Sequence, residues 1–134
     1  TLTKYCTDSS CGTVDNKTVL EPSDDAATAN WGSNWRMPTH AEQEELIEKC
    51  TWTWTTRNGV NGYKVTGPNG NSIFLPVTGS YNGTTIYDRN LVGHYWSSTI
   101  EQNQKAYQLY FDSAGASIND NYNRSVGFAV RGVM

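Results

Sequence analysis

The chain has 134 residues, of which 37% are hydrophobic, 12% aromatic and 17% charged, with a formal net charge of −3. This length suits one domain, and so many apolar and aromatic residues exclude an intrinsically disordered chain. The basic residues are scattered, so we expect no nucleic-acid partner, and no apolar run approaches the roughly 18 residues of a membrane span. The chain starts without Met or an apolar leader. We therefore expect a mature or excised single domain spanning residues 1–134 that does not insert into a membrane.

The first 30 residues contain short β-prone pieces separated by Gly, Asn, Asp and Pro, which predicts strands and loops. This part holds Cys6 and Cys11, and the third cysteine is Cys50. Without a C-x-x-C pair, a zinc site is not expected. Three reduced thiols are one alternative. The polar, Trp-, Tyr- and Asn-rich composition favours the other, an exported protein with one bridge from the N-terminal segment to Cys50, with either Cys6 or Cys11 as its partner.

A helix is predicted from "PTHAEQEELIEKC", residues 38–50. Thr39 is placed to cap it, and Glu42 three residues later completes a capping box. One apolar stripe at helical spacing includes Leu46 and Ile47 and ends at Cys50. The remaining acidic residues are expected to form a solvated face rather than a catalytic carboxylate pair.

Strand signals dominate after this helix. "CTWTWTT" alternates Trp52 and Trp54 with threonines, which predicts a strand with both indoles on one face. Asn-Gly pairs at 58–59, 61–62 and 69–70 predict hairpin turns. A surface loop is expected over 81–94, followed by strands in "YWSST", "AYQLYF" and "FAVRGV". One helix with many short strands predicts an α+β domain.

Catalytic and metal-binding patterns are lacking. His40 is expected in the first turn of the helix and His94 in a loop, and neither belongs to a metal-binding motif. The serines of "WSST" lack the G-x-S-x-G turn that would expose a nucleophile. Most tryptophans are expected to fill the core, and Arg36 and Arg131 to be paired structural charges. We therefore expect no enzyme activity, cofactor or metal.

The C-terminal part carries the most specific functional signal. In "AYQLYFD" alternation places Leu109 and Phe111 towards the core and Gln108, Tyr110 and Asp112 outward. The next residues are dense in Ser, Asn, Asp and Tyr, the composition of antibody-like binding surfaces. The segment of about 100–126 is therefore predicted to face a ligand. The predicted ligand-binding residues are Gln108, Tyr110, Asp112, Ser117, Asn119, Asp120, Asn121, Tyr122, Asn123 and Ser125. The predicted scaffold comprises Trp52, Trp54, Trp96, Leu109, Phe111, Phe128 and Val130.

Four blocks in order, "NWRMPTHAEQEEL", "GHYWSST", "AYQLYF" and "GFAVRGV", resemble the C-type-lectin-fold major paralogous domain of Bacteroidetes surface proteins. The resemblance covers residues 4–133. It implies one α+β domain of C-type lectin topology whose C-terminal segment lies across a supporting sheet, and a bridge between Cys6 and Cys50. The lectin calcium motifs are not matched, because "EPS" at 21–23 precedes the helix and W-N-D is absent. Calcium-dependent sugar binding is therefore not implied.

Some members of the resembled family are variable proteins of diversity-generating retroelements, in which adenine-directed mutagenesis rewrites codons near the end of the gene. Such changes in Asn codons do not yield Lys, Gln, Glu, Trp or Met, and residues 117–126, "SINDNYNRSV", contain none of these five. Gln102, Gln104, Lys105 and Gln108 fall outside the permitted set. These positions would then be fixed, or the protein would be a paralogue that is not diversified.

Three functional hypotheses follow. The first is a non-enzymatic receptor or adhesin domain, exported to a cell surface, the extracellular medium or a virion, that binds a protein or glycan on another cell, phage or host surface. The second is a structural or assembly domain of a surface appendage or virion tip. The third is an enzyme related to the formylglycine-generating group, which shares the helix-start motif, although the chain has no reactive cysteine pair near its C-terminus.

Overall fold

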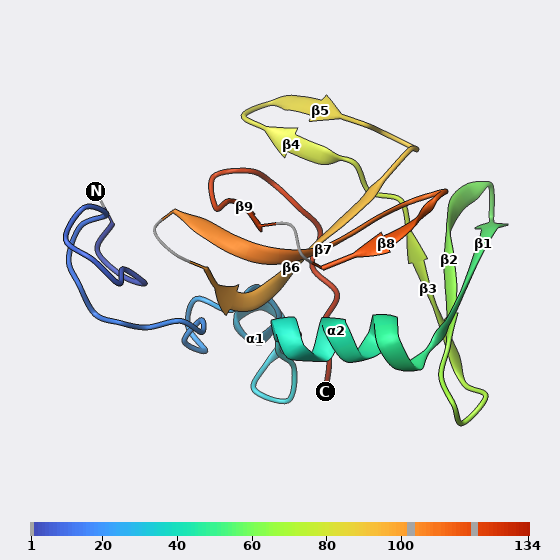
Figure 1. The fold of residues 1–134 in the computed structure, drawn as a ribbon, viewed down its shortest axis with the longest axis horizontal. Coiled ribbons are helices and arrows are strands. Elements are labelled where there is room, and N and C mark those ends of the chain that lie inside the picture. The colour runs from blue at the N-terminus through green and yellow to red at the C-terminus, as the bar shows by residue number, and fades with distance from the viewer. Residues whose placement is uncertain (1, 102–103, 119–120) are drawn as a thin grey trace.

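We describe residues 2–101, 104–118 and 121–134 of a computed structural model (Figure 1). The helices are α1 (Ala26–Trp31) and α2 (His40–Lys49). The strands are β1 (Thr51–Arg57), β2 (Val60–Thr66), β3 (Ser72–Pro76), β4 (Ser80–Asn82), β5 (Thr85–Tyr87), β6 (Gly93–Ile100), β7 (Lys105–Asp112), β8 (Gly115–Ser117) and β9 (Asn121–Asn123). Neither helix is long and apolar enough to cross a membrane.

The expected α+β fold of C-type lectin type is wrong, because the molecule is mostly β, with 42% strand and 12% helix. Its strands form three small antiparallel sheets, ordered β1-β2-β3, β4-β5 and β6-β7-β8, with β9 also paired to β7. Within each sheet the strands β1 to β8 are paired in chain order, whereas β3 does not pair with β4, β5 does not pair with β6, and β9 pairs with β7. Local hairpins of this kind give several small sheets and leave only α2 as a helix of more than two turns.

The predicted helix is confirmed as α2, which begins after Thr39. The Thr39 hydroxyl accepts a hydrogen bond from the Glu42 amide, and the Glu42 carboxylate accepts one from the Thr39 amide at 3.0 Å, which completes the capping box. Arg36 donates two hydrogen bonds to Glu42, at 2.6 and 2.9 Å, as expected for a paired structural charge. These bonds lower the pKa of Glu42 from 4.5 to about 2. Helix α1 was not predicted, and Asp25 caps it.

The first sheet confirms the tryptophan strand and two of the three predicted turns. The β1–β2 turn places Asn58 and Gly59 at φ 51° and 79°, the left-handed pair that a tight hairpin requires. Gly70 turns the chain between β2 and β3 with φ 83°. The predicted turn at 61–62 is wrong, because both residues lie inside β2. Gly62 is required there by close packing, since a Cβ would lie 2.3 Å from the Leu75 carbonyl oxygen.

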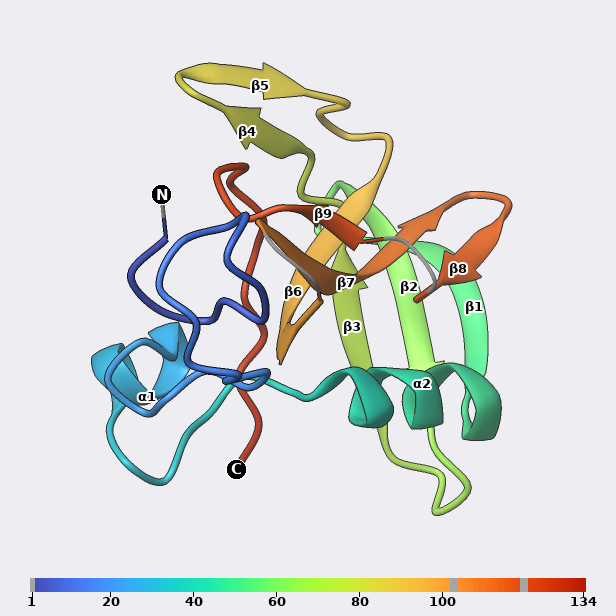
Figure 2. The same ribbon diagram turned by 60° about the vertical axis from the view of Figure 1, so that its left-hand side comes forward.

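Two further expectations about the second half of the chain are wrong. The expected surface loop over 81–94 contains the β4–β5 hairpin, which projects on the side away from α2 (Figures 1 and 2). The expected strand over 128–133 forms only isolated bridges, in which Ala129 pairs with Tyr95 and Val133 with Arg36. This C-terminal tail lies along β6 because the Trp96 amide donates to the Ala129 carbonyl and the Ala129 amide donates to the His94 carbonyl, both at 3.0 Å.

The main core lies between the first sheet, α2 and one face of β6–β7. Its buried residues are Tyr63, Val65, Leu75, Val77, Tyr95, Leu109, Phe111 and Ile118. Trp52 and Trp54 pack against it, with ring centroids 5.3 and 5.0 Å from that of Tyr63, so the prediction of structural tryptophans holds for this pair. On the same side of β7, Tyr107 stacks on His40 in the first turn of α2, with centroids 4.1 Å apart.

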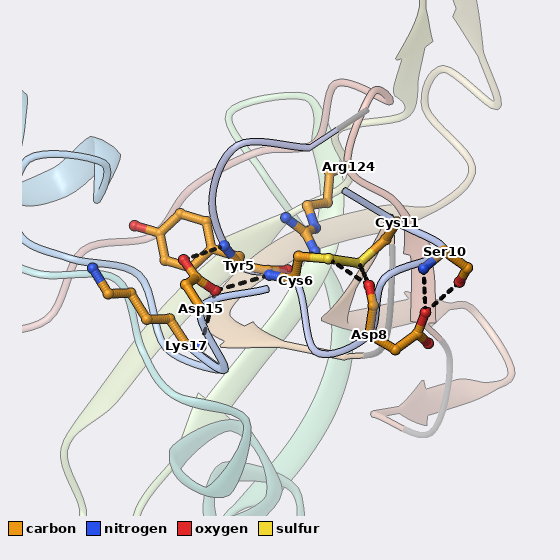
Figure 3. The surroundings of a disulfide bond; sticks show 8 residues. All are labelled: Tyr5, Cys6, Asp8, Ser10, Cys11, Asp15, Lys17 and Arg124. Atoms are coloured by element: carbon orange, nitrogen blue, oxygen red, sulfur yellow. Dashed lines mark hydrogen bonds between the residues drawn. A yellow bond between two sulfur atoms is a disulfide. The ribbon is translucent and has the colours of Figure 1, made fainter. Parts of the chain in front are cut away.

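The expected bridge to Cys50 is wrong, because the disulfide joins Cys6 and Cys11, whose Cα atoms are 6.0 Å apart (Figure 3). The N-terminal segment closes on itself, since the Leu2 amide donates to the Cys11 carbonyl at 2.8 Å and brings the two cysteines together. Cys50 ends α2, packs against the main core and is a free thiol. In Figure 3, Arg124 anchors the cysteine loop by donating to the Tyr5 carbonyl at 2.7 Å.

Candidate functional site

The face of β6–β7 that points away from the main core carries an aromatic platform made of His94, Trp96 and Phe128. The His94 and Phe128 rings are parallel within 8° and 4.3 Å apart, and Trp96 lies 4.4 Å from Phe128. Phe128 belongs to the segment that leads into the C-terminal tail, so that segment folds over the strands. The platform is therefore a second layer of packing that supports the surface residues above it.

Gln108 is the clearest correction within the predicted site. It is 1% exposed and cannot contact a ligand as the structure stands. His94 Nδ1 and Gln108 Oε1 are 2.7 Å apart, and because Oε1 only accepts, the imidazole nitrogen donates. Alternation predicted the correct face of β7, but Phe128 covers that face by stacking on His94. His94 lies in β6 and not in the expected loop.

Tyr110 and Asp112 are half-buried and held in place. The Tyr110 hydroxyl donates to Asp112 Oδ2 at 3.1 Å, and Asp112 Oδ1 accepts from the Ala114 amide at 2.8 Å. Asp112 thus fixes the turn between β7 and β8. Ser117 is half-buried opposite Tyr110 in the β7–β8 pair. These residues order the edge of the sheet more than they offer free contact area.

The β9 segment contains the predicted residues that reach solvent. Tyr122 is 47% exposed, and its ring lies 5.4 Å from that of Phe128. Asn123 and Ser125 are also exposed, whereas Asn121 is half-buried. The predicted residues Asn119 and Asp120 lie outside the described residues.

Sequence reasoning missed the aromatic residues of the β4–β5 hairpin. Tyr81 and Tyr87 are 48% and 51% exposed. The hairpin joins the C-terminal segment because the Tyr81 amide donates to the Gly127 carbonyl at 2.8 Å and the Gly127 amide returns a bond at 2.7 Å. The signal was present in "YNGTTIY", an Asn-Gly turn between β-prone residues, which is a strong hairpin pattern.

We call a set of exposed residues of the β4–β5 hairpin, the loop after it and the β9 segment the tyrosine surface. It comprises Tyr81, Ile86, Tyr87, Leu91, Tyr122, Asn123 and Ser125. Because Tyr81 pairs with Ile86 and Tyr87 with Ser80, Tyr87 lies on the opposite face of the projecting hairpin from Tyr81 and Ile86. Three tyrosines, two aliphatic side chains and two small polar residues can supply rigid contact area together with adaptable hydrogen bonds. The underlying platform limits the freedom of Tyr122, and the bonds to Gly127 hold Tyr81.

The serine hydroxyls of "WSST" are hydrogen-bonded to the backbone. Ser97 Oγ donates to the Tyr107 carbonyl at 2.9 Å, and Ser98 Oγ to the Pro38 carbonyl at 3.4 Å, so both hydroxyls serve the backbone. Within residues 2–101, 104–118 and 121–134, no three His, Cys, Asp or Glu side chains gather as metal ligands.

These features define a small, mostly β domain with exposed aromatic and polar residues on the β4–β5 hairpin and the β9 segment. The chain belongs to a family described as "Domain of unknown function (DUF8237)", whose model matches residues 42–133. The match runs from the first turn of α2 to the C-terminal tail and includes the whole tyrosine surface. No curated protein and no solved structure matches the chain. None of these findings supports the resemblance to lectin-fold surface proteins.

Proposed function

We propose that this domain is a non-enzymatic binding module that holds a protein ligand on the tyrosine surface. The observation that carries the proposal is the exposure of Tyr81, Tyr87 and Tyr122, between 47% and 51%, on backbone held by a packed platform and a bridged hairpin. Rigid, exposed tyrosines lose little conformational entropy when they become buried against a partner. Ile86 and Leu91 add aliphatic area, which favours a protein ligand over a glycan.

An extracellular setting fits the same proposal. The Cys6–Cys11 disulfide belongs to an oxidising compartment. We therefore propose display at a cell surface, in the extracellular medium or on a virion. Treatment of the domain isolated from its source with a thiol-alkylating reagent before reduction tests this, because only Cys50 should be modified.

Binding is tested by screening the immobilised domain against arrays of extracellular proteins and of glycans, and then measuring affinity by surface plasmon resonance. A triple variant, Tyr81→Ala, Tyr87→Ala and Tyr122→Ala, should weaken binding by about a hundredfold or more, since interface tyrosines are frequent hot spots. Trp31→Ala is the matched control, because Trp31 is an exposed aromatic residue of α1. Equal affinity of the folded triple variant and the wild type would refute the site.

An assembly role is the second candidate, and the two aliphatic residues of the tyrosine surface favour it. Leu91 is 64% exposed and Ile86 39%, and such area is often buried between subunits. Sedimentation analysis separates the two roles. A stable oligomer that the triple variant dissolves would favour assembly, whereas a monomer that binds its ligand through the tyrosines would favour a receptor.

Diversification of the C-terminal segment is a finer proposal. Its support is that Tyr122, Asn123 and Ser125 are exposed and belong to residue types that adenine mutagenesis of Asn codons can reach. Gln108 lies outside that set and is buried, as a fixed scaffold position would be. Deep sequencing of the locus should then show substitutions at adenines within codons 117–126. A quiet segment would mean a fixed surface.

A further inference from the structure

A pocket of about 460 Å³ lies between α2, β3 and the C-terminal tail, at the end of the molecule where α2 and the C-terminus lie (Figure 2). Its volume falls within the usual range of small-molecule sites. The apolar part of its wall is formed by Leu46, Cys50, Ile73, Leu75, Tyr95 and Leu109. The β4–β5 hairpin projects from the opposite end (Figures 1 and 2), and no residue of the tyrosine surface lines the pocket, so the pocket is a separate site.

Gln43 gives this pocket a polar group that lacks a partner. The residue is 3% exposed and lines the pocket. Its Nε2 donates to the Tyr95 and Trp96 carbonyls, at 3.2 and 3.4 Å, which orients the amide. Its Oε1 is buried without a hydrogen-bond partner. Such atoms are rare in folded proteins, and an O–H or N–H donor of a bound molecule that reached this oxygen through the pocket wall would satisfy it.

The charges at the rim differ in how they are balanced. Glu42 is paired with Arg36 and Glu45 with Lys49, so each of these carboxylates has a cationic partner. Arg131 also lines the pocket and is exposed, and among the ion pairs of the described residues it has none. The predicted ion pair of Arg131 is thus not found among the described residues. The rim presents one positive charge that an anionic group can neutralise.

We propose that this pocket binds a small amphipathic anion with an apolar body, one O–H or N–H donor and one acidic group. The body occupies the space against Leu75 and Leu109, the donor bonds to Gln43 Oε1, and the acidic group pairs with Arg131. The free Cys50 thiol lies in the same wall and reports occupancy, because a bound molecule shields it from reagents.

The probe for the test is 8-anilinonaphthalene-1-sulfonate, which combines fused aromatic rings, one N–H and a sulfonate. Fluorescence titration of the wild type should show one saturable site. Arg131→Met should weaken probe binding about tenfold, because it removes a charge-assisted hydrogen bond. Gln43→Met should weaken it several-fold, because it removes a neutral hydrogen bond. Arg57→Met is the matched control, because it removes an exposed arginine at the end of β1 that does not line the pocket.

Two measurements locate the probe without relying on those variants. Saturating probe should slow the reaction of Cys50 with N-ethylmaleimide about tenfold or more, and alkylation beforehand should abolish binding. Ile73→Trp, which fills the pocket from β3, should also abolish binding in protein shown to be folded by near-ultraviolet circular dichroism. Absence of saturable binding, or binding that persists after alkylation and in Ile73→Trp, would overturn the proposal. Tyr122→Ala should leave probe binding unchanged.

Discussion

Replacing Gly93 by alanine would place a methyl group inside the ring of Phe111. The two residues are directly paired between β6 and β7, and a Cβ on Gly93 would lie 2.1 Å from Phe111 Cζ and 2.5 Å from both Cε atoms. Ordinary contact begins near 3.4 Å, so the ring would have to move by roughly 1.3 Å. Phe111 is fully buried, and the rings of Tyr63 and Tyr95 lie 5.4 and 5.9 Å from its own, which leaves little room.

The cost of Gly93→Ala follows from this overlap. Overpacking of a core costs about 1–3 kcal/mol, and Gly93 has no positive φ, so the backbone adds no strain. Alanine also lowers the conformational entropy of the unfolded chain, which stabilises the folded state by about 0.5–1 kcal/mol. We expect a net loss of about 1–2 kcal/mol, measured by urea unfolding. Gly67→Ala is the control, because its Cβ would lie 3.2 Å from the side chain of Asn69 and 3.8 Å from the Asn71 carbonyl oxygen, and it should change stability by less than about 0.5 kcal/mol.

A double-mutant cycle tests whether the overlap with the ring is the cause. Phe111→Leu alone should cost about 1–2 kcal/mol by leaving space in the core. In the double variant the leucine leaves room for the new methyl group. The double variant should therefore lose about 1–2 kcal/mol less stability than the sum of the losses of the two single variants. Strict additivity, or a Gly93→Ala variant as stable as the wild type, would refute this account of the β6–β7 packing.

Three further predictions concern other parts of the fold. The pKa of Glu42 is about 2 in the folded state and 4.5 ordinarily, so ionised Glu42 stabilises the fold fully above pH 4.5 and this stabilisation is lost as the pH falls towards 2. Because Glu42 is partly exposed to solvent, we expect the loss to be about 1 kcal/mol. Urea unfolding of the Glu42→Gln variant should not show this acid-dependent loss. Replacing both Cys6 and Cys11 by serine should lower the free energy of unfolding by about 2 kcal/mol at most, because the closed loop is short. Gln108→Leu should lower the free energy of unfolding by about 1–3 kcal/mol, because the His94 N–H would be buried without its acceptor. Thermal unfolding measures this change, and an unchanged stability would mean that the His94–Gln108 hydrogen bond does not stabilise the fold.

Local signals made part of this fold predictable from the sequence. The capping box of Thr39 and Glu42 fixed the start of α2, and alternation placed Leu109 and Phe111 in the core. The Asn58-Gly59 turn was predictable because few residues adopt positive φ readily. Each of these features depends on residues that are near one another in the chain.

The errors arose where a distant contact decides the outcome. Asn61 and Gly62 carry a turn signal, but pairing of β2 with β1 and β3 keeps them in a strand. Gln108 is outward-facing by alternation, and only the fold of the later chain places Phe128 over its partner His94. The disulfide could not be assigned because three cysteines allow several pairings, and spatial closeness alone selects one.

Strands β6 and β7 connect the two proposed sites through the alternation of their side chains. Tyr95 and Leu109 face the core and line the pocket, whereas their neighbours His94 and Gln108 face the other way and support the aromatic platform. A substitution of Tyr95 or Leu109 therefore changes the pocket directly, and one of His94 or Gln108 changes the aromatic platform directly. Either substitution affects the other site only if strands β6 and β7 move. Because the pairing of Tyr95 with Leu109 and of His94 with Tyr110 is continuous, such movement must break backbone hydrogen bonds. We expect Ile73→Trp to abolish probe binding while ligand affinity at the tyrosine surface stays within about twofold of the wild type; a larger change in the folded variant would mean that the sites are coupled through these strands.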